Sequence, residues 1–389
     1  MRVLVAEDDL VSERLLTHLL IKWGHEVIVA RSGREAWEAF ERDEDIQLVI
    51  SDWMMPELDG IEFVRRVRAA ARPGYVYFIL LTAKTQREDL LTGMEAGADD
   101  FITKPFDAAE LRVRLGAGER IVRLEHALAE QNRRMRRDLE AAAAIQRSLL
   151  PPAPPEVAGY RFAWRFLPCD LVAGDILCVH RLDESTMALY VLDVSGHGVP
   201  AAMLSVALSR ALEPMPVRDG LVKRWTSEPP HYLIAEPREV LGELNQRFPM
   251  ASQGNLYHTG IYATLDLASR RITMSRSGHP LPLLIRGGCG EFLAVDGGLP
   301  AGMYPEMDYG QTTCQLQSGD RLYLYSDGLT EAMDARGEMF GEEQLAAAMT
   351  EFAGQPLEET LSEVLRRVHA MTGEEGLSDD VTLLALEVL

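Results

Sequence analysis

The stretch RVLVAEDD at residues 2–9 places a short apolar run directly in front of three acidic residues. The same kind of unit, a β-rich run followed by an amphipathic stretch with helical spacing, recurs up to about residue 115. The runs are RVLVA, EVIVA, LVI, YVYFILLTA and DFI, and the expected helices cover 10–23, 34–40, 61–71, 88–96 and 108–115. Near-continuous apolar strands that alternate with helices predict an α/β unit with a doubly wound, five-stranded parallel sheet.

Polar side chains follow these predicted strands at the points where the strands end. Glu7 and Asp8 follow the first strand, Asp52 ends the third, and Thr82 and Lys104 end the fourth and fifth. Because the carboxyl ends of parallel strands meet at one edge, all five should surround one cleft. Crowded carboxylates repel one another and favour Mg²⁺ with oxygen ligands. Beside this ion Asp52 could attack a phosphoryl group, while Thr82 and Lys104 neutralise the acyl phosphate.

Further along the chain, residues 116–150 contain no proline and many strong helix formers, which predicts a long helix. Heptad spacing gives a seam in which seven of nine residues are apolar. The seam consists of Ile121, Leu124, Leu128, Gln131, Met135, Asp138, Ala142, Ile145 and Leu149. It predicts a homodimer formed by a coiled coil. The alternative is a single helix packed on its own domains, since two seam residues are polar.

The prolines at 151, 152, 154 and 155 end this helix, because proline cannot continue the hydrogen-bond ladder. The predicted domains are therefore 1–118, a helical linker at 119–150, and 151–389. Beyond the prolines, strand-like segments such as TMALYVLDV and VTLLALEVL dominate, with helices near 200–212, 237–247, 341–348 and 357–371. This pattern predicts an α+β domain, an antiparallel β-sandwich flanked by helices. The stretch 213–236 reads as a long excursion.

Acidic residues of this half again stand beside small residues at predicted strand ends. The segments are DLVAGD at 170–175, LDVSGHG at 192–198, YSDG at 325–328 and LSDDVT at 377–382. Glycine permits tight turns that let carboxylates converge. Carboxylates without histidine or cysteine partners favour Mg²⁺ or Mn²⁺ over zinc. Two such ions about 4 Å apart can hold a hydroxide for in-line attack on phosphorus. The plainer interpretation is a set of unrelated Asp-Gly turns.

Composition excludes several classes of function. With 39 Lys and Arg against 60 Asp and Glu, the net charge of −21 disfavours DNA and anionic membranes as partners. The longest apolar run, residues 75–81, is far too short to span a bilayer, and no signal-peptide pattern opens the chain. The four cysteines show no CxxC pair. We therefore expect a cytoplasmic protein with reduced thiols.

The N-terminal motifs resemble a response-regulator receiver domain. They are EDD at 7–9, SDWMMPELDG at 51–60, LTA at 81–83 and TKPF at 103–106. The resemblance implies that Asp52 is the phosphoacceptor, that Glu7, Asp8 and the Met54 carbonyl hold Mg²⁺, and that a sensor histidine kinase or phosphotransfer protein is the partner. It also implies that Thr82 and Lys104 bind the phosphoryl group. Phe101 occupies the position of the family's rotating aromatic switch, where it lacks the hydroxyl of a tyrosine.

Residues 143–389 resemble the PP2C-like serine/threonine phosphatases of the SpoIIE and RsbU type. The motifs are AAIQRSLLPP, DLVAGD, DVSGHGVPAAML, SGHPLPLL, GGLPAGM, LYLYSDGLTEAMD and SDDVTLL. The resemblance implies that Asp193 bridges two metal ions, that the Val194 carbonyl ligates one of them, and that Asp175 holds the bridging water. The other ion would be ligated by Asp327 and one acid of a neighbouring pair, Asp379 in preference to Asp380.

Two positions of this half leave questions open. His197 either protonates the leaving serine oxygen or only shapes its glycine-rich turn. Cys178 stands where the family often has an acid, so we expect activity to survive with weaker metal affinity.

Together these features predict a response regulator in which phosphorylation of Asp52 controls a metal-dependent protein phosphatase. The family resemblance implies a substrate phosphorylated on serine or threonine, a STAS-type anti-sigma-factor antagonist. The layout also resembles RssB-type regulators, so the alternative is a non-catalytic adaptor that binds a stress sigma factor. The intact acid set favours the enzyme, because an adaptor has no need of carboxylates that repel one another without metal.

Overall fold

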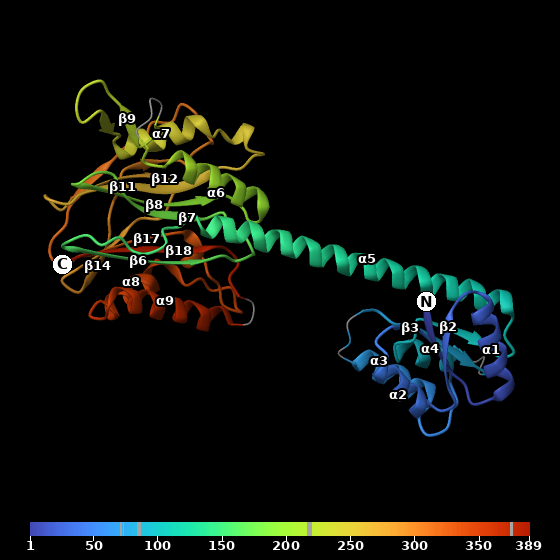
Figure 1. Ribbon diagram of the computed structural model, residues 1–389. Coiled ribbons are helices and arrows are strands. Elements are labelled where there is room, and N and C mark those ends of the chain that lie inside the picture. The colour runs from blue at the N-terminus through green and yellow to red at the C-terminus, as the bar shows by residue number, and fades with distance from the viewer. Residues whose placement is uncertain (71, 73, 84–86, 216–219, 374–375) are drawn as a thin grey trace. The chain divides into compact units, whose positions relative to one another are not determined.

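The computed structural model describes residues 1–389 except 71, 73, 84–86, 216–219 and 374–375. The chain forms two compact units, Met1–Arg137 and Asp138–Leu389. Figure 1 shows an α/β unit at the N-terminal end and a larger unit of stacked sheets and helices at the C-terminal end.

The first unit contains five parallel strands in the order β2-β1-β3-β4-β5. The strands are β1 (Arg2–Ala6), β2 (Glu26–Ala30), β3 (Ile46–Asp52), β4 (Tyr77–Thr82) and β5 (Asp100–Thr103). The helices between them are α1 (Leu10–Lys22), α2 (Gly33–Arg42), α3 (Gly60–Ala69) and α4 (Arg87–Glu95). The predicted doubly wound sheet is confirmed. Its strand order reverses between β1 and β3, which places the functional cleft at their carboxyl ends.

Local sequence explains where helices of this unit begin. Asp9 caps α1 by accepting a hydrogen bond from the Ser12 amide at 2.9 Å, and Asp59 caps α3 through the Glu62 amide at 2.7 Å. A β-carbon on Gly60 would lie 2.3 Å from the Asp52 carbonyl oxygen. Only glycine therefore lets α3 start directly against the end of β3.

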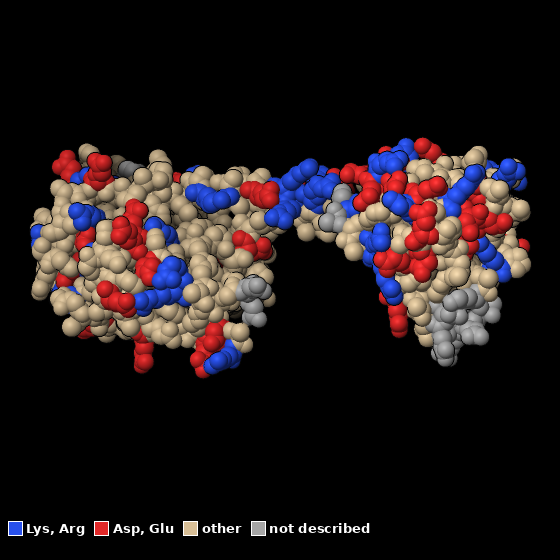
Figure 2. Space-filling view, turned by 90° about the horizontal axis from the view of Figure 1, so that it is seen from below, with Lys and Arg blue, Asp and Glu red and all other residues tan. Residues whose placement is uncertain are grey.

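Helix α5 (Ala108–Arg147) is continuous over 40 residues and belongs to both units. The helix expected at 108–115 and the helical linker are thus one element. Leu124, Leu128, Met135 and Ile145 on it are 53–65% exposed in the single chain. Figure 2 shows basic side chains crowding the exposed length of this helix, where residues 133–137 include four arginines. Its middle therefore does not pack on its own unit, and pairing of two helices remains a prediction.

The second unit is a sandwich of two sheets. One sheet has the order β15-β12-β11-β8-β7, with β16 paired to β12, and the other has the order β14-β13-β17-β18-β6. The strands are β6 (Tyr160–Leu167), β7 (Ile176–Arg181), β8 (Thr186–Val194), β11 (His258–Asp266), β12 (Arg271–Ser277), β13 (Leu283–Arg286), β14 (Cys289–Phe292), β15 (Gly297–Gly298), β16 (Thr312–Gln315), β17 (Arg321–Tyr325) and β18 (Val381–Val388). Buried apolar residues of both sheets form one core between them.

Helices cover both outer faces of this sandwich (Figure 1). Helices α6 (Val199–Ala211) and α7 (Pro237–Arg247) lie on the first sheet, and α8 (Gly341–Glu351) and α9 (Leu357–Thr372) lie on the second. Within the described part of this sandwich, all strand pairs except β12–β15 are antiparallel. The predicted α+β class with a helix-flanked antiparallel sandwich is confirmed.

The excursion expected at 213–236 contains a small hairpin, β9 (Lys223–Trp225) and β10 (Tyr232–Ile234). Its residues 216–219 lie outside the described part. Three-residue strands carry too little alternation to be predicted. Within the described residues, no helix has both the length and the apolar character required to cross a membrane.

Candidate metal centres

Three carboxylates meet at the strand ends of the first unit. Glu7 and Asp8 follow β1 and Asp52 ends β3, and one ligand oxygen from each lies within 4.8 Å of the others. Glu7 is fully buried and Asp8 is exposed. The structure thus brings together the acids predicted to hold Mg²⁺. Met54 lies next to them, and its amide nitrogen is 3.4 Å from Asp52 Oδ1.

Lys104 supplies a positive charge to these acids from the end of β5. Its Nζ lies 2.6 Å from Asp52 Oδ2 and 2.7 Å from Glu7 Oε2. Burial, together with the charge of Asp52, raises the pKa of Glu7 to about 7, although Lys104 opposes the shift. Burial alone would lower the pKa of Lys104, but its bonds to the two acids outweigh burial and raise it. Thr82 is buried beside them, and its carbonyl accepts the Lys104 amide at 2.8 Å.

Phe101 lies on β5, where it pairs in register with Leu80. The Arg114 guanidinium, on α5, lies 5.7 Å from the centre of its ring. Arg114 also forms ion pairs with Asp100 and Glu110. Phe101 therefore contacts the long helix through a cation–π contact with Arg114, and its role as a switch remains a prediction.

Acids from both sheets converge in the second unit. Asp193 lies at the end of β8, Asp327 opens the 3-10 helix η2 (Asp327–Leu329) after β17, and Asp175 precedes β7. The remaining pair, Asp379 and Asp380, precedes β18. The structure therefore gathers the sequence-predicted acids of four separate segments at one end of the sandwich.

Two glycines permit this convergence. A β-carbon on Gly174 would lie 2.8 Å from the Val194 carbonyl oxygen, and one on Gly328 would lie 2.2 Å from the carbonyl oxygen of Asp380. Each acid-bearing turn is thus packed directly against the backbone of another. Side chains larger than hydrogen would push the turns, and the carboxylates that they carry, apart.

Two carboxylates at the centre of this cluster lack compensating charge. Asp175 is 1% exposed, and among the described residues neither of its oxygens has a partner with hydrogen-bond geometry. Burial and the charge of Asp193 raise the pKa of Asp175 well above its usual range, while the nearby hydroxyls of Thr382 and Ser326 oppose the shift. Burial and the charges of Asp327 and Asp379 likewise raise the pKa of Asp193. Such a donor set fits divalent cations with oxygen ligands.

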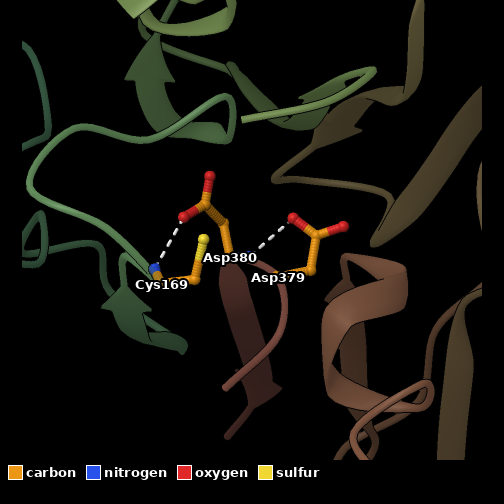
Figure 3. Close-up of side chains that lie close together, drawn as sticks. All are labelled: Cys169, Asp379 and Asp380. Carbon is orange, nitrogen blue, oxygen red and sulfur yellow. Dashed lines mark hydrogen bonds between the residues drawn. The ribbon is translucent and has the colours of Figure 1, made fainter. Parts of the chain in front are cut away.

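The two neighbouring acids before β18 have different roles. Asp380 is buried, and its oxygens accept the backbone amides of Cys169 and Gly174 at 2.8 and 2.7 Å. Among the described residues, the hydrogen bond that Asp379 accepts comes from the amide of Asp380, at 2.8 Å (Figure 3). Burial and the charge of Asp327 raise the pKa of Asp379. Asp380 therefore fixes the loop before β7, and Asp379 is the acid available to the cluster.

Other predicted positions are also located. His197 is exposed on the turn after β8, near enough to Asp379 for its charge to lower the pKa of that acid. Val194 is buried at the end of β8. Cys178 is buried in the apolar core under α6 and α7, beside His180 at 3.6 Å, and belongs to none of the acid groups found among the described residues.

Sequence reasoning missed two residues of this site. Gln146, on α5, is buried and binds the loop before β7: its Nε2 donates to the Ala173 carbonyl at 2.6 Å, and its Oε1 accepts the Ala173 amide at 3.0 Å. It lies in the AAIQRSLLPP motif, which was the available signal. Cys169 lies beside Asp379 and Asp380. No local sequence pattern predicts this position, because its neighbours Asp379 and Asp380 lie about 210 residues further along the chain.

Comparisons with known proteins agree with this division. A family model described as response regulator receiver domain matches residues 3–116, and one described as Stage II sporulation protein E matches residues 183–389. The "Chemotaxis protein CheY homolog" of Campylobacter jejuni strain 81-176 is 33% identical over 126 residues, which cover 31% of this chain and 97% of the relative. "Chemotaxis protein CheY1" of Helicobacter pylori strain 26695 is 33% identical over 116 residues, covering 30% of this chain and 94% of the relative.

Among solved structures, the SiaA-PP2C domain of Pseudomonas aeruginosa has a TM-score of 0.56 at 21% identity, and covers 67% of this chain and 100% of that domain. At this identity the similarity shows the fold. The Stage II sporulation protein E model matches more than half of the chain, and the receiver match covers almost the whole of single-domain relatives. The chain therefore belongs to the Stage II sporulation protein E (SpoIIE) family and is a response regulator with an N-terminal receiver domain and a C-terminal PP2C-type phosphatase domain.

Proposed function

We propose that this protein is a two-component response regulator in which phosphorylation of Asp52 controls a Mn²⁺- or Mg²⁺-dependent protein serine/threonine phosphatase. The observation that carries the phosphatase proposal is Asp175, a carboxylate buried beside Asp193 without a partner of hydrogen-bond geometry among the described residues. Like charges buried together are unfavourable unless protons or cations compensate them. Bound divalent cations would offset the repulsion between these buried carboxylates, whereas a purely structural role leaves that repulsion uncompensated.

Each acid takes a role that follows from its position. Asp193, the Val194 carbonyl, Asp327 and Asp379 would hold the divalent ions. When bound, these ions supply an activated water for in-line attack on phosphorus. Asp175, whose oxygens have no hydrogen-bond partner among the described residues, would orient that water by accepting a hydrogen bond from it. His197 lies exposed beside Asp379, where its imidazolium can deliver a proton to the leaving serine or threonine oxygen.

The receiver site has the residues for reversible phosphorylation. Asp52 accepts the phosphoryl group from a sensor histidine kinase or phosphotransfer protein, and Glu7, Asp8 and the Met54 carbonyl would hold Mg²⁺ beside it. Lys104, already bonded to Asp52, pairs with the new phosphoryl charge, and Thr82 donates its hydroxyl to it. Phosphorylation would thus give Lys104 and Thr82 a new partner. Lys104 directly follows β5, the strand that contains Phe101, and Thr82 ends the neighbouring strand β4.

Helix α5 connects the two sites in one element. At one end Arg114 packs on Phe101, and at the other Gln146 holds the backbone of Ala173, two residues before Asp175. The Gln146 Nε2 also donates to Ser205 Oγ of α6 at 3.0 Å. A rotation or shift of α5 would move the Asp175 loop relative to Asp193. Exposed Leu128 and Met135 would pair with a second copy, so a homodimer through the linker would couple two receivers to two phosphatases.

The substrate we propose is a phosphorylated STAS-type anti-sigma-factor antagonist in the cytoplasm. The test offers purified full-length protein such a phosphorylated antagonist and measures phosphate release with Mn²⁺ or with a chelator, with and without acetyl phosphate. Release that requires Mn²⁺ supports the proposal. If no phosphate appears under any of these conditions, the enzyme proposal fails, and the non-catalytic adaptor that binds a stress sigma factor becomes the better account.

A further inference from the structure

His279 is a buried histidine to which the proposed phosphatase mechanism gives no role. It is 1% exposed and lies in the connection that leaves β12 of the first sheet and enters β13 of the second. We propose that His279 is a positioning residue, whose imidazole holds the acids of the two sheets at the spacing that the divalent ions require. This inference rests on the metal site of the proposed function and adds the group that sets its width.

One ring nitrogen of His279 is bonded to the first sheet. Its Nδ1 lies 2.8 Å from Oγ1 of Thr259 on β11. Thr259 pairs in register with Asp193 of β8. Directly paired side chains point to the same face of a sheet, with their β-carbons about 5 Å apart. The imidazole thus holds the side chain next to a proposed metal ligand.

The backbone of the second sheet also acts on the imidazole. Burial and the charge of Arg276 lower the pKa of His279 to about 3, and the backbone of Tyr325 opposes this shift. A carbonyl close to a ring N–H has that effect, because it stabilises the protonated ring. Tyr325 ends β17, two residues before Asp327. The ring of His279 therefore lies between the strand pair that carries Asp193 and the turn that carries Asp327.

The ring is neutral, and its two nitrogens have different tasks. A neutral imidazole has one N–H donor and one acceptor nitrogen. Nε2 of His279 is buried and has no partner of hydrogen-bond geometry among the described residues, so it is the nitrogen left for the Tyr325 carbonyl. Nδ1 then accepts a hydrogen bond from the hydroxyl of Thr259. This tautomer uses one nitrogen for each sheet.

The backbone that carries the ring is itself held in place. The amide of Gly278 donates to the carbonyl of Gly298 at 2.8 Å, and Arg276 Nη1 donates to the carbonyl of His279 at 2.8 Å. These bonds limit the movement of the backbone on both sides of the ring. The imidazole can therefore act as a spacer of constant length.

The spacing matters because the proposed metal ligands come from both sheets. Asp193 lies on β8 of the first sheet, and Asp327 follows β17 of the second. Metal–ligand distances tolerate changes of only about 0.2 Å. Replacing a residue that orients metal ligands from outside typically lowers metal affinity about 10- to 100-fold. Without the spacer, the main loss should therefore be in affinity for Mn²⁺ and not in the rate at saturating Mn²⁺.

The test measures Mn²⁺ binding by the full-length protein in the absence of substrate. Binding is followed by the loss of the electron paramagnetic resonance signal of the free aqueous ion. Asp327→Asn, which keeps the receiver site, defines the part of the binding that belongs to the phosphatase. His279→Phe keeps a ring but removes both nitrogens, and we expect it to raise the dissociation constant of that part about tenfold. An unchanged constant would overturn the proposal.

His180→Phe is the matched control. It removes another histidine of the same unit, whose Nδ1 lies 3.6 Å from the sulfur of Cys178 in the core under α6 and α7. We expect its Mn²⁺ affinity to equal that of the parent. If His180→Phe and His279→Phe lose Mn²⁺ affinity equally, the effect is a general loss of packing and the positioning role is overturned.

Thr259→Val is a second variant, which removes only the hydroxyl that bonds to the imidazole. If His279 acts through Thr259, this change should weaken Mn²⁺ binding in the parent but cause no further loss in His279→Phe. Two losses that simply add would overturn positioning through Thr259. Should His279→Phe not fold, an unchanged Mn²⁺ affinity in Thr259→Val would overturn the proposal.

Phosphatase rates distinguish a positioning role from a loss of folded enzyme. The Mn²⁺ concentration for half-maximal rate should rise about tenfold in His279→Phe, while the rate at saturating Mn²⁺ falls by less. A lower saturating rate with an unchanged Mn²⁺ requirement would contradict positioning.

The binding measurement also separates this inference from the proposed function. Equal Mn²⁺ binding by the parent and Asp327→Asn would count against the proposed metal site itself. Binding that is lost in Asp327→Asn but retained in His279→Phe would overturn the inference alone.

Discussion

The two acidic sites of this chain compensate their charge in different ways. In the receiver, Lys104 lies within ion-pair distance of both Asp52 and Glu7. In the phosphatase, no lysine or arginine of the described residues forms an ion pair with Asp175, Asp193, Asp327 or Asp379, and the pKa values of Asp175, Asp193 and Asp379 are raised, with burial as the largest cause. The receiver acids thus have a cation built into the fold, whereas the phosphatase acids have none among the described residues, which is the arrangement that the proposed metal site requires.

The largest expected effect is the loss of a phosphatase carboxylate. Asp327→Asn should lower Mn²⁺-dependent turnover by about 1,000-fold or more, because losing several kcal/mol of transition-state stabilisation costs a factor of ten per 1.4 kcal/mol. Asp308→Asn, at an exposed acid outside the cluster, is the matched control. Phosphate release is the measurement. Turnover near the parental rate in Asp327→Asn would mean that the cluster does not hold the catalytic ions.

The second largest effect is expected from substitutions in helix α5 that prevent its pairing and so uncouple the phosphatase from the receiver. Replacing Leu128 and Met135 by Asp puts charge on two exposed apolar positions of α5, and pairing such helices would bury unpaired charges. We expect the double variant to sediment as a monomer. Its phosphatase rate should be the same with and without acetyl phosphate. An unchanged dimer in sedimentation would assign the interface to the receiver or phosphatase domains and end the coiled-coil proposal.

Gln146 tests the contact between α5 and the acid cluster. Gln146→Ala removes three hydrogen bonds that involve Ala173 and Ser205 and leaves buried polar groups unpaired, at a cost of about 1–3 kcal/mol. These hydrogen bonds hold the Asp175 loop in place. Turnover should therefore fall about tenfold for each 1.4 kcal/mol of transition-state stabilisation that is lost when the loop is released. Asn132→Ala, at an exposed position of the same helix outside the heptad seam, should behave as the parent. Equal rates for both variants over a range of Mn²⁺ would remove Gln146 from the coupling.

The smallest expected effect is the pH dependence of the stabilisation of the fold by Mn²⁺. The raised pKa values of Asp175 and Asp193 mean that, above the ordinary carboxyl value of 3.8, the folded state holds protons that the unfolded state has released. Without metal, stability is therefore greatest at the acidic end of this window and falls as the pH rises through it. Because Mn²⁺ replaces those protons, its stabilisation should grow with pH, up to about 2.7 kcal/mol at a 100-fold excess over its dissociation constant.

Thiol labelling of Cys178 during urea unfolding measures this effect, because every cysteine of the chain lies in the second unit and Cys178 is 3% exposed. Protection by Mn²⁺ is compared at each pH with a chelator control at that pH. Protection that is equal or larger at about pH 5 than at about pH 8 would contradict the assignment of raised pKa values to these acids.

The sequence predicted most of the receiver but only part of the phosphatase site. Near-continuous apolar runs that alternate with helical patterns, with Asp52 and Lys104 at strand ends, were enough for the first unit because parallel topology brings strand ends together. In the second unit the preference for Asp379 over Asp380 came from family resemblance alone, and the contacts that support it, from the backbone amides of Cys169 and Gly174 to Asp380, come from a distant segment. Contacts such as Gln146 with Ala173 depend on packing between distant segments, which no local pattern encodes.

Control of the phosphatase by the receiver is the central claim, and one rate comparison tests it most directly. Phosphate release from a phosphorylated STAS-type antagonist is measured in Mn²⁺ before and after acetyl phosphate, for the parent and for Asp52→Asn. We predict that the donor changes the parental rate at least about fivefold, the lower end of ordinary allosteric coupling, and leaves the rate of Asp52→Asn unchanged. A parental rate that does not respond, or an equal response in both proteins, would contradict control through Asp52.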